Sequence, residues 1–584
     1  MDAQRLLAVP DIERTDRADG GILLRNRCAL PEPLPDILNR FDFWVAENGG
    51  ATMVSDDDGA NIASRRVLDR RSDAAAARLN DLVPRAASTI AVIAGASVDH
   101  AVLKLACHKA GLVHAALAPA LVGSDFGRGR LADLLAIAKP ALILADDRSN
   151  GIADALAPIA TAPIHDIGDL TAGDGAAPFV RPPHAPGDAA ALYFTSGSTG
   201  APKGVTITRG MIASNQAAYT VHWPFLTRRP PVLLDWLPWH HVFGGLDNFY
   251  KMIWTGGEYH VDLPPDPTRI ETMAARLREV RPTLHINVPF GIALLLDRLD
   301  TDPETRAAFF SRLELIMFAG AGMDAPTWAR LQHAVETVAN PPTLVSGYGM
   351  TEAASTICLG LEPARKTGEI GFPLPGHTLL LKPIEDTEGS WEIRVRGPNV
   401  APHYVTDEGI TSLPLDSEGF LKTGDLAAAI HNTAPERGIT FDGRLAEDFK
   451  LATGTRVKTG ALRHALLEAC APDLADVAIA GEGRSYLAVI LFPRLESAAP
   501  DDLAALTERL EKALTEHNAM SAGSSTAIRR AILASRPPDR SAGEINDKGH
   551  LVQRRTLANR QPLVARLYAD NSQERIIVSQ EEPL

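Results

Sequence analysis

The sequence has few cysteines and no long apolar run. Its four cysteines lie far apart among 584 residues and form no CxxC pair, which disfavours a zinc ribbon or a disulfide-rich secreted scaffold. No stretch reaches the roughly 18 consecutive apolar residues of a transmembrane helix. The charged N-terminal stretch also lacks the apolar core of a signal peptide. We therefore expect a cytoplasmic protein without a membrane span.

Basic residues are the minority charge. Lys and Arg number 58 against 72 Asp and Glu, which gives a formal net charge of −14. A surface this acidic has no electrostatic reason to bind nucleic acid or an anionic membrane, and we expect neither partner. Hydrophobic residues at 45% and charged residues at 22% are typical of globular proteins. At about 150 residues per domain, the length predicts three or four packing units.

Alternating strand and helix patterns predict an α/β fold. Residues 89–94 form a short apolar run that is typical of a buried strand, and residues 98–110 form a helix pattern between Ser97 and Gly111. Strand–helix–strand order implies a parallel sheet. Further strand patterns span residues 112–117, 140–145, 232–237, 283–288, 313–318 and 343–346.

The second half of the chain changes character. Residues 171–188 are rich in Gly, Pro and Ala and predict a loop, whereas residues 377–445 are β-rich. A mixed pattern then returns, with an amphipathic helix over residues 503–517. We predict a large N-terminal domain of stacked α/β sheets with a small β-rich part, followed by a smaller, mobile α+β domain. The predicted domains span residues 1–443 and 444–584, with a hinge near 443–447.

The most informative string is YFTSGSTGAPKG, residues 193–204. Glycines let backbone N–H groups converge on an anion, hydroxyls add neutral donors, and a lysine adds positive charge, so the string predicts a phosphate-binding loop. It is not a Walker A loop, because Lys203 follows Pro202 and is followed by Gly204. The candidate residues are Thr195, Ser196, Gly197, Ser198, Thr199, Gly200 and Lys203.

This string resembles the signature loop of the adenylate-forming superfamily, which includes acyl-CoA synthetases, peptide-synthetase adenylation domains and luciferases. Further landmarks of that superfamily follow in order from about residue 90 to residue 555. Three segments are most similar to bacterial feruloyl-CoA synthetases: DWLPWHHVFGG (235–245), GRLAEDFKL (443–451) and EINDKG (544–549).

The resemblance implies an ATP-dependent acid–CoA ligase. A carboxylate attacks the α-phosphate of ATP to give acyl-AMP and pyrophosphate, and the thiolate of CoA then displaces AMP. Two anions meet in the first step, so positioning and charge stabilisation by cations, Mg²⁺ and oriented donors carry the catalysis. The resemblance also implies an aromatic acid such as ferulate, and a C-terminal domain that rotates between the two half-reactions.

A second nucleotide motif is GYGMTE, residues 347–352. By resemblance, Tyr348 stacks on adenine, Thr351 donates to the α-phosphate and Glu352 binds Mg²⁺, a hard cation that prefers oxygen ligands. Alone, the glycine–aromatic–glycine string would rather predict a tight turn after a strand, and its order and spacing relative to the phosphate loop favour the nucleotide motif. Gly320, Gly347 and Gly349 complete this set of nucleotide-binding candidates.

The C-terminal half supplies the remaining candidates. By resemblance, Asp425 accepts from the ribose hydroxyls, Arg444 reaches ribose or phosphate, Lys450 contacts the intermediate and Lys548 is the adenylation lysine. Two extra residues separate Lys548 from the following arginine, compared with the commonest superfamily form. Ala446 stands where many relatives have Asp or Lys, which leaves the hinge residue open.

The acid pocket is expected around His241, which by resemblance lines the pocket and shifts between half-reactions. The other pocket candidates are Phe243, Gly244, Asp247, Ala319, Ala321 and Ala354. The adjacent His240 and His241 are not predicted to chelate one metal ion, because neighbours in a strand point to opposite faces.

Other readings stay open. The acid could be aliphatic or of another kind, and the thiol acceptor could be a carrier protein. A binding protein that keeps the fold without catalysis is a third reading. The oligomeric state is not determined by the sequence, and a homodimer is among the states left open.

Overall fold

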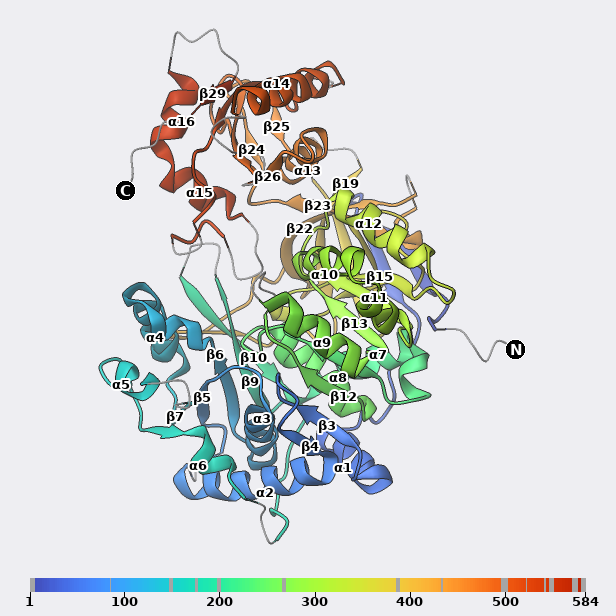
Figure 1. The fold of residues 1–584 in the computed structure, drawn as a ribbon, viewed down its shortest axis with the longest axis vertical. Coiled ribbons are helices and arrows are strands. Elements are labelled where there is room, and N and C mark those ends of the chain that lie inside the picture. The colour runs from blue at the N-terminus through green and yellow to red at the C-terminus, as the bar shows by residue number, and fades with distance from the viewer. Residues whose placement is uncertain are drawn as a thin grey trace.

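The computed structural model contains two large sheets and a separate C-terminal unit (Figure 1). The α/β class and the order of a large N-terminal and a smaller C-terminal part are as the sequence predicts. The structure describes residues 6–83, 86–146, 151–173, 177–196, 201–264, 269–384, 389–431, 434–494, 503–520, 523–539, 542–545, 551–569 and 576–578. Among these, no helix is long and apolar enough to cross a membrane.

The larger sheet has a parallel half built from strand–helix units. Its strands run in the order β15, β14, β13, β11, β12, β3, and the antiparallel β4 (Ile62–Ser64) closes this edge. Their bounds are β15 Thr343–Tyr348, β14 Leu315–Ala319, β13 Leu284–Asn287, β11 Val232–Asp235, β12 Glu258–Val261 and β3 Thr52–Ser55.

Helices cover both faces of this half, so its strands are apolar on both sides. In β14, Ile316 and Phe318 pack with one apolar cluster, whereas Leu315 and Met317 pack with another. The alternation follows from the two-residue period of a strand. The first cluster includes residues of α9 (Ile270–Val280), α10 (Pro289–Thr301), α11 (Pro303–Phe310) and α12 (Ala325–Glu336).

The other half of the larger sheet is antiparallel and β-rich, as residues 377–445 predict. Its strand order is β1, β2, β18, β19, β22, β23, β17, β16. The bounds are β1 Ile12–Asp16, β2 Ile22–Asn26, β16 Cys358–Leu359, β17 Glu369–Pro373, β18 Thr378–Pro383, β19 Ser390–Arg396, β22 Leu421–Ala429 and β23 Ile439–Arg444.

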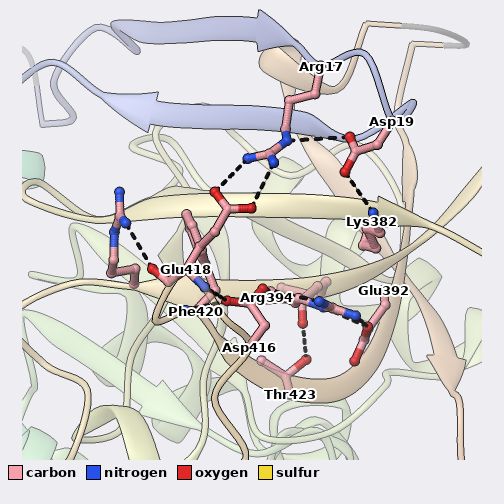
Figure 2. Close-up of polar contacts among 11 residues, drawn as sticks. Arg17, Asp19, Lys382, Glu392, Arg394, Asp416, Glu418, Phe420 and Thr423 are labelled. Carbon is pink, nitrogen blue, oxygen red and sulfur yellow. Dashed lines mark hydrogen bonds and ion pairs between the residues drawn. The ribbon is translucent and has the colours of Figure 1, made fainter.

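A polar network fixes the turn that leads into β22 (Figure 2). Arg17, beside the first hairpin, donates two hydrogen bonds of 2.7 and 2.9 Å to Glu418. Asp416 accepts from the backbone N–H of Glu418 and Phe420 and from Arg394, at 2.9, 3.0 and 3.1 Å. The N-terminal hairpin and β19 thus hold the start of the strand that carries Asp425.

The second sheet has eight described strands in the order β21, β20, β10, β9, β6, β5, β7, β8. Helix α3 (Val98–Ala110) lies against it, and all thirteen of its residues are buried. Gly111 ends this helix at φ 70°, the left-handed conformation that glycine adopts without strain. The strands are β5 Thr89–Ile93, β6 Val113–Leu117, β7 Leu142–Ala145, β8 Ile164–Asp166, β9 Ala189–Ser196, β10 Pro202–Thr208, β20 Tyr404–Thr406 and β21 Gly409–Thr411.

Further helices pack around the two sheets. Helix α2 packs against α3, and α4 lies over β10 and β5. The remaining helices of this part are α1 Ile37–Asn48, α2 Arg65–Leu82, α4 Asp125–Ala138, α5 Ile152–Leu156, α6 Ile167–Thr171, α7 Arg209–His222 and α8 Phe249–Thr255. The predicted loop at 171–188 is confirmed over 177–188, and its first residue is the last one of α6.

The C-terminal unit has its own apolar core. A four-stranded sheet, β26–β27–β28–β29, packs against α13 and α14 on one side and α15 and α16 on the other (Figure 1). Helix α14 (Leu503–Met520) contains the predicted amphipathic helix. The other elements are β24 Phe449–Lys450, β25 Arg456–Val457, α13 Thr459–Ala469, β26 Leu474–Ala480, β27 Leu487–Pro493, β28 Ile528–Leu533, α15 Gln553–Asn559, α16 Gln561–Tyr568 and β29 Ile576–Val578.

Candidate active site

The predicted phosphate loop connects β9 to β10. The two strands are antiparallel, and Thr195 pairs with Lys203 across them. Both residues are partly exposed. The predicted residues Gly197, Ser198, Thr199 and Gly200 lie outside the described residues, as does the side chain of Ser196.

Lys203 lies beside an aromatic residue that no motif indicated. Its Nζ is 5.0 Å from the centroid of the Tyr404 ring, because β10 pairs with β20 and brings Tyr404 alongside. The Tyr404 hydroxyl donates a 2.8 Å hydrogen bond to Oε1 of Glu352. Burial and the neighbouring Glu352 raise the pKa of Tyr404, so its phenol stays protonated and donates. The structure thus brings the predicted lysine and the predicted carboxylate to the two sides of one tyrosine.

The turn after β15 is sterically constrained. A Cβ on Gly349 would lie 1.5 Å from the carbonyl oxygen of Ser355, so only glycine fits there. Ala354 and Ser355 have φ of 49° and 86°, which turns the chain back on itself. Thr351 and Glu352 lie in the short 3-10 helix between these points, η6 (Thr351–Ala353). The fold therefore presents the candidate phosphate and metal residues on a rigid turn.

Two other predicted glycines lie close by. A Cβ on Gly347 would lie 2.3 Å from Cε of Met317 in the neighbouring strand β14. Gly320, directly after β14, has φ +80° and is exposed. Since β14 and β15 are parallel, both glycines lie at the carboxyl edge of the sheet, where α/β proteins bind ligands.

Tyr348, Asp425 and Arg444 form a chain of contacts. The Tyr348 hydroxyl donates to Oδ2 of Asp425 at 2.8 Å, and Nε of Arg444 donates to Oδ1 at 3.1 Å. Asp425 raises the pKa of Arg444, and burial raises that of Tyr348, so the guanidinium is charged and the phenol is neutral. The side chain of Asp425 is 10% exposed and that of Arg444 is 61% exposed. Three residues predicted to bind the nucleotide thus lie together.

The segment expected to line the acid pocket is not a strand. After β11 it makes a turn and then a π-helix, η4 (Val242–Asn248), a form that is frequent at functional sites. The rings of His240 and His241 lie 4.5 Å apart, so the prediction that they point to opposite faces is wrong. A turn lets successive side chains converge, whereas a strand separates them. Within the described residues, no group of three His, Cys, Asp or Glu could hold a metal ion.

The backbone around this π-helix is closely packed. A Cβ on Gly244 would lie 2.4 Å from the carbonyl oxygen of Leu237, and one on Gly245 would lie 2.0 Å from that of Trp239. His241, Phe243 and Ala321 are partly exposed, whereas Ala319 and Ala354 are buried. Of these predicted pocket residues, a substrate can therefore reach the side chains of His241, Phe243 and Ala321.

Asp247 is part of a buried polar network. Its side chain has no exposure. Oδ1 accepts from Asn215 at 2.7 Å, and Oδ2 accepts from Tyr219 and from Lys251, each at 2.9 Å. Its carboxylate therefore binds the protein's own donors. No sequence motif marks Asn215, Tyr219 or Lys251. The first two reach Asp247 through packing of α7, and Lys251 lies four residues after it on α8.

The predicted hinge region is held by contacts on both sides. The Asp442 carboxylate accepts from Ser390 of β19 at 2.6 Å and from Lys458, just before α13, at 3.0 Å. Gly443 has φ +103°, and the Leu445 N–H donates to the Gly424 carbonyl at 2.8 Å. The domain limits and the hinge stay predictions.

Of the two predicted lysines of the C-terminal unit, the structure describes Lys450. Lys450 is exposed on β24. Lys548 lies outside the described residues. Before it, the Glu544 carboxylate accepts three hydrogen bonds from Arg560, the shortest of 2.8 Å.

The carboxylate of Glu352 fits the role of a magnesium ligand. Its oxygen atoms can ligate a metal ion, and the residue is 6% exposed. The side-chain partner described for it is the neutral phenol of Tyr404, which does not neutralise the carboxylate charge. One carboxylate is typical of Mg²⁺ sites in which substrate phosphates and waters complete the shell.

Two family models match the chain, one over each of its main parts. The family model described as "AMP-binding enzyme" matches residues 41–405, and the one described as "AMP-binding enzyme C-terminal domain" matches residues 448–572. The human long-chain-fatty-acid–CoA ligase 1 is 26% identical over 357 residues, 54% of this chain and 49% of that protein. The malonate–CoA ligase of Arabidopsis thaliana is 28% identical over 333 residues, 53% and 52% of the two chains. The chain thus spans about half the length of these curated relatives.

Solved structures share the fold. ATP-bound MatB from Rhodopseudomonas palustris superimposes with a TM-score of 0.70 at 22% identity, covering 90% of this chain and 99% of that one. The anthranilate CoA ligase AuaEII in complex with anthranoyl-AMP gives 0.72 at 16% identity, covering 92% and 99%.

Proposed function

The chain belongs to the AMP-binding enzyme family, and on that premise we propose that it is an AMP-forming acid–CoA ligase. It would convert a carboxylate and ATP to acyl-AMP and pyrophosphate, and then transfer the acyl group to CoA. The observation that carries the proposal is the chain Tyr348–Asp425–Arg444. It places an aromatic ring, a hydroxyl acceptor and a cation together beside the turn that carries Thr351 and Glu352.

In the adenylation step, this chain's residues bind and orient the nucleotide. Asp425 accepts from the ribose, and Tyr348 packs on the base while its hydroxyl holds Asp425 in place. Thr351 and the phosphate loop donate to the phosphates. Magnesium, bound through Glu352 and the phosphates, would neutralise charge on the triphosphate. Lys203 adds a cation, and its neighbour Tyr404 orients Glu352.

The acid would bind beside the π-helix, with His241 and Phe243 at its surface. Held in line with the α-phosphate, its carboxylate gains the advantage of proximity, which lowers the activation barrier by up to about 7–11 kcal/mol for well-oriented reactants. Lys548 would stabilise charge on the α-phosphate as pyrophosphate leaves. After rotation about the hinge, the CoA thiolate would attack the acyl carbonyl and release AMP.

We further propose an aromatic acid, such as a hydroxycinnamate like ferulate, as the substrate. The support is the similarity of residues 235–245, 443–451 and 544–549 to bacterial feruloyl-CoA synthetases. Residues 236–246, 319–323 and 347–356 also contain no Lys or Arg, so they offer no cation to a second carboxylate. This composition favours a monocarboxylic acid with an uncharged tail over a dicarboxylic acid such as malonate.

Trapping with hydroxylamine tests the proposal. The purified chain, ATP and Mg²⁺ are incubated with ferulate, p-coumarate, benzoate, medium-chain fatty acids and malonate, and the hydroxamates are measured. CoA-dependent release of AMP then separates a CoA ligase from an enzyme that loads a carrier protein. A preference for fatty acids would replace the aromatic assignment by the aliphatic one. Absence of hydroxamate with every acid would contradict the enzyme proposal and favour a binding protein.

A further inference from the structure

Helix α3 buries a lysine that the proposed mechanism does not use. Lys104 is 1% exposed, and the helix is buried on all sides, with β6 of the eight-stranded sheet, α2 and α6 packed against it. A buried ammonium is costly unless something replaces the water it loses. The contacts of Lys104 therefore need an explanation.

Four aromatic rings surround its amine. Nζ lies 5.2 Å from the ring centroid of Phe249, 5.3 Å from Tyr250, 5.7 Å from Trp239 and 6.0 Å from Tyr193. It donates one weak hydrogen bond of 3.4 Å to the Tyr193 hydroxyl. Aromatic faces attract a cation within about 6 Å, most strongly in a dry site. The set Tyr193, Trp239, Phe249 and Tyr250 is called the aromatic cage below.

The groups facing Lys104 are neutral in the described part of the chain. Burial lowers the pKa of His100 and His108 to about 3, lowers that of His114 well below its ordinary value, and raises that of Cys107 to about 12. Burial also raises the pKa of Tyr193 and Tyr250. Without an anion nearby, burial lowers the pKa of Lys104 to about 7, so the cage is its main source of stabilisation as a cation.

The cage joins parts of the proposed site that come from different sheets. Tyr193 belongs to β9, which leads into the phosphate loop. Trp239 directly precedes His240 and His241, and its carbonyl abuts Gly245 of the π-helix. His100, one turn before Lys104, packs its ring 5.0 Å from that of Trp239.

Hydrogen bonds also hold the indole of Trp239 in place. Its Nε1 donates to the Tyr259 hydroxyl at 2.8 Å, and that hydroxyl donates to Asp235 at 2.8 Å. Since Trp239 is 1% exposed and closely packed, a shift of its ring displaces the histidines that follow it.

We propose that Lys104 is a positioning residue for the acid site: its amine, held in the aromatic cage, fixes Trp239 against β9 and thereby sets His240 and His241 relative to the phosphate loop. This inference rests on the proposed function, because it assigns a role within the same site. It adds a residue that touches neither the nucleotide nor the acid.

The test compares Lys104→Met with the wild type. Methionine keeps the length of the side chain and removes the charge, and replacing a buried charge by an apolar group of similar shape is often neutral for stability. We expect the KM for the acid to rise about tenfold, the factor that corresponds to about 1.4 kcal/mol. The KM for ATP should change by less than about twofold, because the chain Tyr348–Asp425–Arg444 is untouched.

The pH dependence of the acid KM distinguishes the effect of the Lys104 charge from the effect of its size. In the wild type, Lys104 loses its proton above about pH 7, so the acid KM should rise between about pH 6 and about pH 9. In Lys104→Met the acid KM is already raised, and this rise should be missing. Lys109→Met is the matched control: this buried lysine of the same helix is paired with Asp69 and Asp73 at 2.7 Å, away from the cage. It should lose stability and keep the wild-type acid KM and pH profile.

These measurements distinguish a failure of this inference from a failure of the proposed function. An active wild type with unchanged acid KM in Lys104→Met would overturn this inference alone. A wild type that forms no hydroxamate with any acid would overturn the proposed function and this inference together. If Lys104→Met does not fold, Lys104→Gln and the wild-type profile replace it, and a wild-type acid KM that is constant from about pH 6 to about pH 9 would overturn the inference.

Discussion

The phenol of Tyr348 donates a 2.8 Å hydrogen bond to Oδ2 of Asp425, 77 positions further along the chain. The two residues come from β15 and β22, which lie in different halves of the larger sheet. Burial raises the pKa of this phenol, so it stays protonated and donates its hydrogen bond to the carboxylate. In the proposed site, this bond would hold Asp425 in place to accept from a ribose.

Removing that hydroxyl should weaken ATP binding. Tyr348→Phe keeps the ring and loses a hydrogen bond to a charged group, which is worth about 1.5–3 kcal/mol. We expect the KM for ATP to rise roughly tenfold or more, with the KM for the acid unchanged. Tyr486→Phe, which removes a phenol that donates to a backbone carbonyl in the C-terminal unit, is the control and should leave both constants unchanged. Equal changes in both KM values for Tyr348→Phe would contradict the assigned role.

Glu352 and Tyr404 should act together on magnesium. Glu352→Gln removes the anionic ligand, and Tyr404→Phe removes the hydroxyl that orients it. We expect Tyr404→Phe to raise the Mg²⁺ concentration for half-maximal activity by roughly tenfold, as is typical of residues that orient a ligand, and Glu352→Gln to raise it further. Titration of hydroxamate formation with Mg²⁺ measures both. A wild-type Mg²⁺ requirement in Glu352→Gln would show that another group binds the metal.

Lys548 should serve only one half-reaction. Lys548→Ala is expected to abolish hydroxamate formation from acid and ATP, because the cation assigned to the α-phosphate as pyrophosphate leaves is then missing, while conversion of supplied acyl-AMP with CoA continues. The exposed lysine Lys512 on α14 offers the control Lys512→Ala, which should leave both half-reactions intact. Equal loss of both half-reactions in Lys548→Ala would refute the division of roles.

Gly349 should not tolerate a side chain. In Gly349→Ala the new Cβ would lie 1.5 Å from the Ser355 carbonyl oxygen, so the turn must move. We expect a loss of about 1–3 kcal/mol in the free energy of unfolding, measured by urea denaturation, and a raised KM for ATP. Gly322→Ala, where a Cβ would meet no atom within 4 Å, is the control and should be stable. Wild-type stability in Gly349→Ala would show that the turn is not rigid.

Acid should destabilise the protein through its buried histidines. Burial lowers the pKa of His100, His108 and His222 to about 3 from 6.5, so between these values the unfolded chain binds more protons than the folded one. Stability is therefore present above pH 6.5 and falls as the pH drops toward 3, by about 1.4 kcal/mol per pH unit for each histidine. Urea denaturation at a series of pH values measures the slope. His222→Gln should reduce it by one proton, and an unchanged slope would contradict a neutral buried His222.

Much of the fold could be predicted from local patterns. The helix at 98–110 matches the structure residue for residue, because Ser97 caps its start and Gly111 ends it in the left-handed conformation. The strand at 89–94 was predicted within one residue, because a short apolar run between turns has few alternatives. The segment at 236–245 differs, because its conformation depends on how Gly244 and Gly245 pack against backbone that follows β11.

The candidate site also contains residues that the sequence indicated and residues that it did not. The sequence indicated Lys203, Tyr348, Glu352, Asp425 and Arg444, because each lies in a string whose order and spacing are specific. It did not indicate Tyr404, Lys251 or Lys104, which occur in no motif.

The sequence by itself determined most of the elements, the family resemblance and the residues proposed to bind a nucleotide, since these depend on neighbours along the chain. Only the tertiary structure decided the partners: that Tyr404 joins Lys203 to Glu352, that Asp247 binds the protein's own donors, and that Lys104 lies among aromatic rings. These contacts depend on how two sheets pack around one buried helix, and that packing joins residues far apart in the chain.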